Sequence, residues 1–139
     1  MACKLVNGRL ARHVAMRWLR ARIFNNVFYN PTALEWSSIL FVGAHNAGIV
    51  VKNNVFVDHP GAQTVLVESG GDVSLDHNVY YGGGTLNWHG VVSNTLLDRQ
   101  TSSGQDINSF IDAPMFEDPP SDLHVPAISP SSIPAWTSD

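Results

Sequence analysis

The chain has 139 residues, a formal net charge of −4 and a single cysteine. This length allows at most one domain, and one cysteine excludes an internal disulfide. No stretch approaches the roughly 20 consecutive apolar residues of a membrane-spanning helix, so no membrane partner is expected. Low charge (14% of residues) together with many Gly, Pro, Asn and Ser residues is typical of a turn-rich β protein.

Residues 1–22 differ in kind from the rest of the chain. They hold six of the eight basic residues and no acidic residue, whereas all twelve acidic residues follow. Apolar residues recur every fourth position from Val6 to Trp18, which predicts a basic amphipathic capping helix; an unstructured leader is the alternative. The arginines interrupt any apolar run, so no signal peptide is recognised. The acidic body opposes nucleic-acid binding, and no nucleic-acid partner is expected.

The most informative feature is a six-residue segment, 23–28, that returns at 51–56 and at 75–80. Its first position is always aliphatic, its fifth is Val and its sixth is Phe or Tyr. The residues at the invariant fourth position are Asn26, Asn54 and Asn78. A repeat of this length, built on strand-forming residues, indicates stacked coils of chain.

Each copy reads as two short strands joined by a bend. Apolar residues alternate before the bend, and β-branched and aromatic residues follow it. The invariant Asn is expected to occupy the bend in a left-handed conformation. In stacked coils these asparagines would form a hydrogen-bonded column, a structural ladder.

A polar break and a further strand follow each copy, at residues 38–42, 64–67 and 85–88. Equivalent strands of successive coils would stack in parallel, about 4.7–4.9 Å apart. The sequence therefore predicts an all-β parallel solenoid of about three coils over residues 23–103, followed by an irregular closing segment and tail over 104–139. An antiparallel sandwich is the alternative.

The repeat resembles the coils of right-handed parallel β-helix proteins, the pectate-lyase-like superfamily. The three Asn-Val-Phe/Tyr bends carry this resemblance, together with residues 104–109 and 112–118, which are similar to the segment that closes such domains. The resemblance implies a carbohydrate-associated role, as part of a polysaccharide lyase or glycoside hydrolase. Because relatives usually have more coils and are often exported, it also implies a carboxyl-terminal fragment of a longer, secreted protein. The compartment of this chain itself stays open.

Three residues are the catalytic candidates: Asp76, His77 and Asp58. His77 interrupts the Asn column at the third position of the repeat and is a candidate general base; a turn-forming role is the alternative. Asp58 and Asp76 are the candidate carboxyl pair that a glycosidase places roughly 5–9.5 Å apart.

Substrate binding is predicted for a basic residue and for rings outside the strand columns: Lys52, Tyr81, Trp88 and His89. The alternative for Lys52 is a surface ion pair with Asp76, and the alternative for Trp88 and His89 is burial under the closing loops. The clustered carboxylates of a calcium-dependent lyase are not visible, so no metal and no cofactor are predicted. Two other functions remain open beside catalysis. One is non-catalytic polysaccharide binding, and the other is self-association through open coil ends.

Overall fold

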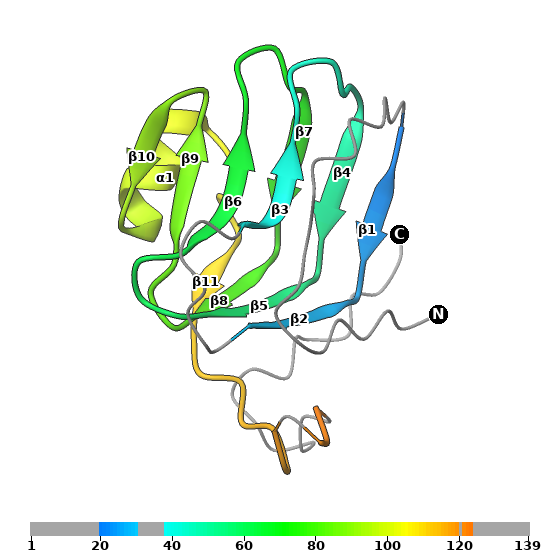
Figure 1. Ribbon diagram of the computed structural model, residues 1–139, viewed down its shortest axis with the longest axis vertical. Coiled ribbons are helices and arrows are strands. Elements are labelled where there is room, and N and C mark those ends of the chain that lie inside the picture. Colours follow the sequence, from blue (N-terminus) through cyan, green and yellow to red (C-terminus); the bar gives the residue numbers. More distant parts are fainter. Residues whose placement is uncertain (1–19, 31–37, 120, 124–139) are drawn as a thin grey trace.

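The computed structural model describes residues 20–30, 38–119 and 121–123. Within them the chain forms strands almost throughout, with one helix near the carboxyl-terminal side (Figure 1). In chain order the elements are β1 (Arg22–Phe24), β2 (Val27–Asn30), β3 (Ser38–Val42), β4 (Ile49–Lys52), β5 (Val55–Asp58), β6 (Gln63–Val67), β7 (Val73–Asp76), β8 (Val79–Tyr81), β9 (Thr85–Trp88), β10 (Val91–Ser93), α1 (Leu96–Ser103) and β11 (Phe110–Ile111).

The chain passes through the same three sheets three times, in the same order. The first sheet is β1-β4-β7, the second is β2-β5-β8-β11 and the third is β3-β6-β9-β10. All neighbours pair in parallel except β9 and β10. We call each pass a coil: coil 1 is β1-β2-β3, coil 2 is β4-β5-β6 and coil 3 is β7-β8-β9. The three coils lie side by side in Figure 1. Their parallel pairing confirms the prediction of an all-β fold of largely parallel strands.

The register between coils explains the sequence repeat. Ile23 pairs with Val51, and Val51 with Leu75, so the first positions of the three segments form one column. Asn26, Asn54 and Asn78 follow in the same register, each bonded to the next. The spacings of 28 and 24 residues between them are therefore the lengths of one coil of chain.

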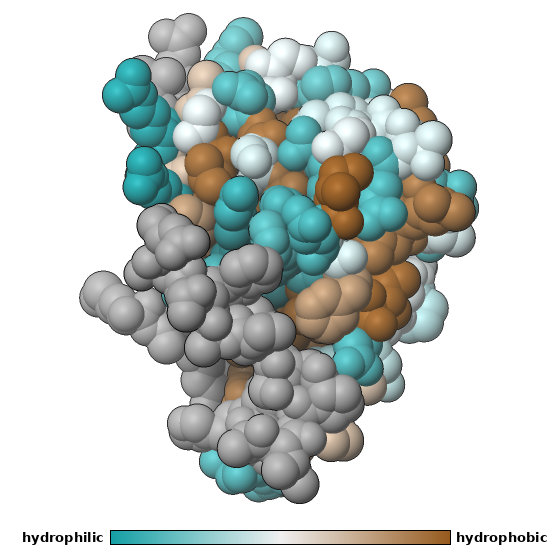
Figure 2. Space-filling model, turned by 180° about the vertical axis from the view of Figure 1, so that it is seen from behind, coloured by the Kyte–Doolittle hydropathy of each residue, from teal (hydrophilic) through white to brown (hydrophobic). Residues whose placement is uncertain are grey.

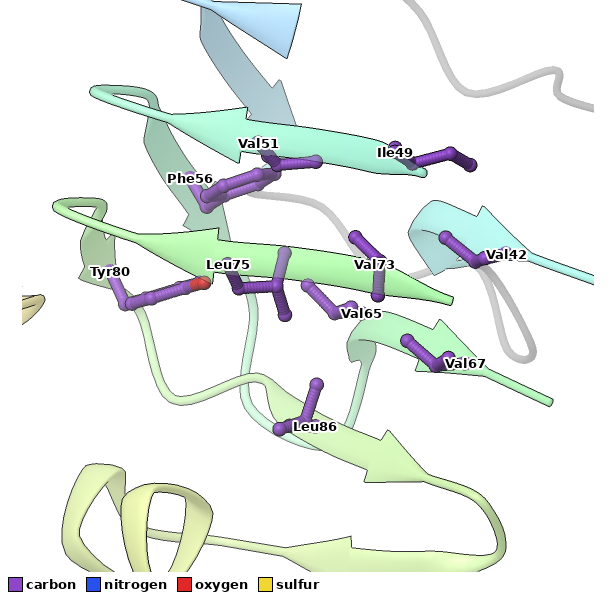
Figure 3. Packing of buried hydrophobic residues seen from close by; sticks show 10 residues of the cluster. All are labelled: Val42, Ile49, Val51, Phe56, Val65, Val67, Val73, Leu75, Tyr80 and Leu86. Atoms are coloured by element: carbon purple, nitrogen blue, oxygen red, sulfur yellow. The ribbon is translucent and has the colours of Figure 1, made fainter. Parts of the chain in front are cut away.

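Alternate residues of all three sheets point inward and form the core (Figure 3). The alternation is clearest in β4, where Ile49 and Val51 are buried and their neighbours are not. A period-two pattern buries one face of a strand, as the aliphatic columns predicted. The buried cluster consists of Val42, Ile49, Val51, Phe56, Val65, Val67, Val73, Leu75, Tyr80 and Leu86.

The invariant asparagines are hydrogen-bonded along the stack. Asn26 Nδ2 donates to Asn54 Oδ1 and Asn54 Nδ2 donates to Asn78 Oδ1, both at 3.2 Å. The backbone amides of Asn26 and Asn54 donate to the same two oxygens. Asn54 and Asn78 are fully buried, so these bonds satisfy polar groups that would otherwise be costly in the core.

The predicted backbone conformation of these asparagines is wrong. The left-handed residues are those one position earlier, Asn25, Asn53 and His77, with φ between 56° and 57°. Asn adopts this conformation more readily than most residues, which explains the first two positions. The residue at the third position of the repeat therefore turns the chain, and the asparagine at the fourth position forms the hydrogen bonds to the neighbouring coil.

An aromatic stack runs beside the asparagine column. The Phe28 and Phe56 rings lie 4.9 Å apart and the Phe56 and Tyr80 rings 5.2 Å apart, all nearly parallel. The Arg99 guanidinium lies over the outer face of Tyr80, 4.2 Å from its centroid. The stack thus ends in a cation–π contact rather than in another ring.

The helix α1, which supplies Arg99, is not among the predicted elements. Thr95 caps its first turn through a hydrogen bond from the Asp98 amide, and Gly104 ends it in a left-handed conformation. Both residues are ordinary helix-end signals, so the segment could have been recognised from sequence. It lacks the β-strand repeat because it covers the last coil instead of extending it.

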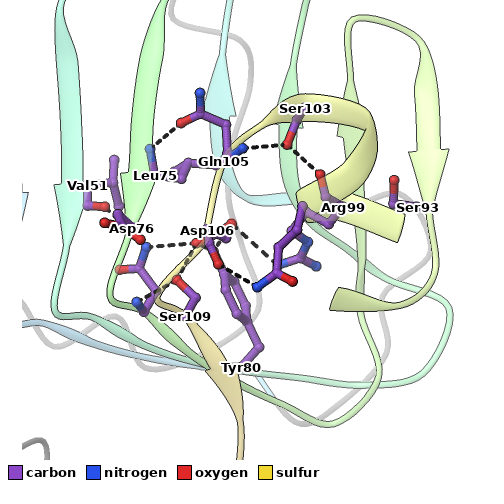
Figure 4. A network of polar contacts seen from close by, with 12 residues as sticks. Val51, Leu75, Asp76, Tyr80, Ser93, Arg99, Ser103, Gln105, Asp106 and Ser109 are labelled. Carbon is purple, nitrogen blue, oxygen red and sulfur yellow. Dashed lines mark hydrogen bonds and ion pairs between the residues drawn. The ribbon is translucent and has the colours of Figure 1, made fainter. Parts of the chain in front are cut away.

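Residues 105–111 close coil 3 with side chains in place of a full coil (Figure 4). Asp106 Oδ1 accepts from Asn78 Nδ2 at 3.3 Å, which continues the asparagine column. Gln105 Oε1 accepts from the Leu75 amide at the edge of β7, and β11 pairs with β8. The predicted closing segment therefore includes a short strand. The predicted amino-terminal helix, up to residue 19, and the tail after 123 lie outside the described residues.

Candidate functional site

The repeat places three unlike side chains in one accessible column at the end of the first sheet. Phe24 is in register with Lys52, and Lys52 with Asp76. We call these residues the bend column, because the bend follows each of them directly. Phe24 is 40% exposed, and the Asp76 side chain is 19% exposed. Of the predicted site residues, the structure brings Lys52, Asp76 and His77 to this one edge.

Asp76 is held from two sides. Its Oδ2 lies 2.9 Å from His77 Nδ1, and its two oxygens accept from the backbone amide and the side-chain amide of Asn108. Asn108 belongs to the closing segment, and no repeat pattern marks it in the sequence. The result is an Asp–His pair at the surface whose carboxylate has a fixed orientation.

These contacts decide the charge of Asp76. Burial by itself raises the pKa of this carboxyl, but the hydrogen bonds from Asn108 and the neighbouring His77 outweigh it. The net pKa lies below its ordinary value, so Asp76 is an anion at neutral pH. Asp76 can therefore accept hydrogen bonds or orient His77, but it cannot act as a general acid, because a general acid must hold a proton.

Asp58 lies elsewhere. It ends β5, whereas Asp76 precedes the bend that leads into the equivalent strand β8. The three residue steps of β5 alone span about 10 Å, and the two carboxyls share no hydrogen-bond partner. The structure therefore does not bring the predicted carboxyl pair together.

Asp58 is 2% exposed, and its Oδ1 accepts from Asn30 Nδ2 and from the His59 amide. Burial raises the pKa of this carboxyl more than the contacts with His59, Thr64 and Asn30 lower it. His59 Nε2 is buried 4.0 Å from Asp58 Oδ1, and His59 Nδ1 lies 2.9 Å from the Pro60 carbonyl oxygen. The pair forms a buried polar corner under the turn after β8.

The predicted ring residues separate into different environments. Trp88 is in register with Val67 and packs against the core, so its expected place outside the strand columns is wrong. His89 lies 4.8 Å from the Trp88 ring, with Nε2 3.2 Å from the Gly71 carbonyl oxygen. Tyr81 is 47% exposed and lines a pocket beside α1.

That pocket has a volume of about 60 Å³ and lies between coil 3 and α1. Gly84 in its wall passes directly over Asp58 and Thr64: a Cβ there would be 3.3 Å from Asp58 Oδ2 and would overlap Thr64 Oγ1. Asp58 itself does not line the pocket. On the face seen in Figure 2, hydrophilic side chains are mixed with hydrophobic ones and the described surface has no uniform character.

Among the described residues, no group of three His, Cys, Asp or Glu side chains is placed to hold a metal ion. In the same part of the chain, no helix has the length and apolar character needed to cross a membrane. Comparison of the chain with protein-family models, with curated proteins and with solved structures gives no match.

Proposed function

We propose that the chain is part of a right-handed parallel β-helix of the pectate-lyase-like kind. Three passes through the same three parallel sheets support this proposal, as do the hydrogen-bonded asparagine column and the aromatic stack. A circular dichroism spectrum dominated by β structure would fit it, and an experimental structure would test the hand of the coils.

We infer further that this domain binds polysaccharide along the bend column. The observation that carries the inference is the in-register column of Phe24, Lys52 and Asp76 at an accessible edge. It offers a ring face, a cation and a fixed carboxylate, one coil apart, over about 10 Å. Rings suit the apolar faces of sugars, and paired charges suit their hydroxyl groups or carboxylates. A linear polymer laid along the coil axis would meet all three.

Binding is favoured over hydrolysis because the candidate carboxyls do not face each other. Asp58 is buried in its own corner, and Asp76 carries no proton at neutral pH. A hydrolase needs a protonated and an ionised carboxyl on either side of one bond.

A lyase is the second candidate, and the Asp–His pair favours it. Asp76 Oδ2 at 2.9 Å from His77 Nδ1 is the arrangement that orients an imidazole as a general base. Lys52, on the neighbouring coil, would neutralise the carboxylate of a uronate. In this proposal His77 takes the proton from the carbon next to that carboxylate, the glycosidic C–O bond on the following carbon breaks to leave a carbon–carbon double bond, and water protonates the departing oxygen.

The test is to incubate the full chain with a panel of neutral and uronate polymers. Retardation in affinity electrophoresis reports binding, ultraviolet absorbance reports unsaturated products, and a reducing-end assay reports cleavage. Binding without products, lost in Lys52→Ala and kept in Arg22→Ala, supports the binding domain. A rise in both ultraviolet absorbance and reducing ends supports the lyase, and in that case His77→Gln should show neither rise. No retardation by any polymer would refute carbohydrate binding.

A further inference from the structure

The buried corner formed by Asp58 and His59 contains a ring nitrogen that neither proposed function uses. The side chains of Asp58 and His59 are 1% and 11% exposed. His59 Nε2 is buried and has no hydrogen-bond partner among the described residues. It lies 4.0 Å from Asp58 Oδ1, which is too far for a hydrogen bond. A buried polar atom without a partner is unfavourable, so its place beside a carboxyl group needs a physical reason.

The contacts of His59 determine which of its ring nitrogens carries hydrogen. Nδ1 lies 2.9 Å from the Pro60 carbonyl oxygen, which can only accept, so Nδ1 is the donor. In the neutral ring Nε2 then has only a lone pair, and the Asp58 oxygen that faces it is an acceptor when the carboxyl is ionised. Two acceptors therefore face each other. One added proton, on either group, would convert them into a donor and an acceptor.

The other contacts of the corner are neutral. β2 places Asn30 against the Asp58 carboxyl, β6 places Thr64 there, and Gly84 passes over it from the turn after β8. Of the described residues that act on Asp58, His59 is the only titratable one, and Asp58 is the only described carboxyl paired with His59. Burial raises the pKa of the Asp58 carboxyl, which favours a bound proton. A proton also needs no cavity, so it suits a corner that is closed to solvent.

The corner lies where coils 2 and 3 meet. A Cβ on Gly83, in the turn after β8, would be 3.8 Å from Pro60. The Ala62 amide donates to the His59 carbonyl oxygen at 3.2 Å, and the Thr85 amide donates to the Ala62 carbonyl oxygen at 2.8 Å. These two bonds run from His59 to the first residue of β9. A change in the position of His59 should therefore reach coil 3 through them.

We propose that Asp58 and His59 bind one proton between them and that this proton is a pH-dependent latch on the turn after β5. With the proton bound, His59 Nε2 donates to Asp58 Oδ1 after a movement of about 1 Å, which fixes residues 59–62 against coil 3. When the proton leaves to solvent, a buried carboxylate faces a lone pair and the turn opens more readily. The closed corner holds a proton that the open turn releases, so the latch stabilises the turn in mildly acidic solution and is lost as pH rises. It does not depend on the bend column.

The test is NMR of the full chain, labelled with ¹³C and ¹⁵N, between about pH 4 and 8. The signals of the Asp58 carboxyl carbon and of the His59 ring nitrogens should move with one common midpoint, because the two groups share a proton. Across that midpoint, the protection of the Ala62 and Thr85 amides from hydrogen exchange, corrected for the intrinsic rate, should fall about three- to tenfold. The absence of a common midpoint, or constant protection of the two amides across it, would overturn the proposal.

Variants separate the latch from general effects of acid. His59→Gln supplies a neutral amide that can donate to Asp58 but does not titrate, so protection of the two amides should stay constant with pH. Asp58→Asn removes the carboxyl in the same way and tests the latch if His59→Gln does not fold. His89→Gln is the matched control, because His89 Nε2 also lies beside a backbone carbonyl oxygen, at 3.2 Å, and this variant should keep the pH dependence of the unmodified chain. The same pH dependence in His59→Gln or in Asp58→Asn would show that the proton is bound elsewhere.

Discussion

At the scale of single residues, position in the stack sets the consequence of a substitution. Asn54 is fully buried and bonds both neighbouring coils, whereas Asn26 is partly exposed and lies in coil 1. Asn54→Ala should lower the free energy of unfolding by about 2–4 kcal/mol, because several buried groups lose their partners at once. Asn26→Ala should cost about 1 kcal/mol. Urea denaturation measures both, and equal losses would mean that the column does not act through burial.

The contributions of Asp58 and Asp76 to the free energy of unfolding should change in opposite directions as pH rises. The pKa of Asp58 is raised in the folded protein, so the folded state binds more protons and loses stability as pH rises from the ordinary value of 3.8 through the folded pKa. The pKa of Asp76 is lowered, so its contribution is present above 3.8 and is lost as pH falls through the folded pKa.

Asn variants at these two positions test this. Above its folded pKa, Asp58→Asn should gain stability relative to the unmodified chain, and the gain should disappear toward pH 3. Asp76→Asn should lose stability at pH 7, with the loss shrinking in more acidic solution. Thermal unfolding between pH 3 and 8 measures both differences. Parallel pH profiles for the two variants would contradict the opposite environments described for them.

At the scale of elements, the turn between β8 and β9 depends on a close backbone approach. Gly82 has a φ of 99°, and a Cβ there would collide with the Asp58 carbonyl oxygen. Gly90 has a similar φ of 90°, but a Cβ there would meet nothing within 4 Å. Gly90→Ala should therefore cost about 1–2 kcal/mol from backbone conformation alone. Gly82→Ala should cost at least about 2 kcal/mol more, because the chain must move.

Chemical denaturation of the two glycine variants at one pH gives this comparison directly. Similar losses would show that the turn relaxes away from Asp58 at little cost.

The same elements show what the sequence can and cannot predict. The strands of coils 1–3 were predictable because one inward column requires one kind of residue in every coil, as at Ile23, Val51 and Leu75. The closing segment has no such constraint: Gln105 and Asp106 replace the backbone and side-chain bonds of a whole coil. The contact of Asn108 with Asp76 and the burial of Arg99 follow from that closure, so no repeat in the sequence announces them.

At the scale of the whole molecule, the stack is a one-dimensional array with unequal ends. Coil 2 has a paired neighbour on both sides in all three sheets, and coil 3 is followed by β10, β11 and the Gln105 and Asp106 side chains. Among the described strands, β1, β2 and β3 of coil 1 each form the edge of their sheet. In such an array each coil is stabilised mainly by its neighbours.

Protection from amide hydrogen exchange should follow this order. The Val55 amide donates to the Asn26 carbonyl oxygen and joins coil 2 to coil 1, whereas the Val79 amide donates to the Asn54 carbonyl oxygen and joins coil 3 to coil 2. Of these two amides, that of Val79 should exchange more slowly. We expect coil 1 amides to open at a lower free energy than those of coils 2 and 3, by about 1–3 kcal/mol. Native-state exchange followed by NMR resolves these positions. Uniform protection across the three coils would instead mean that coil 1 is stabilised by further contacts at its outer edge, and that the array unfolds as one cooperative unit.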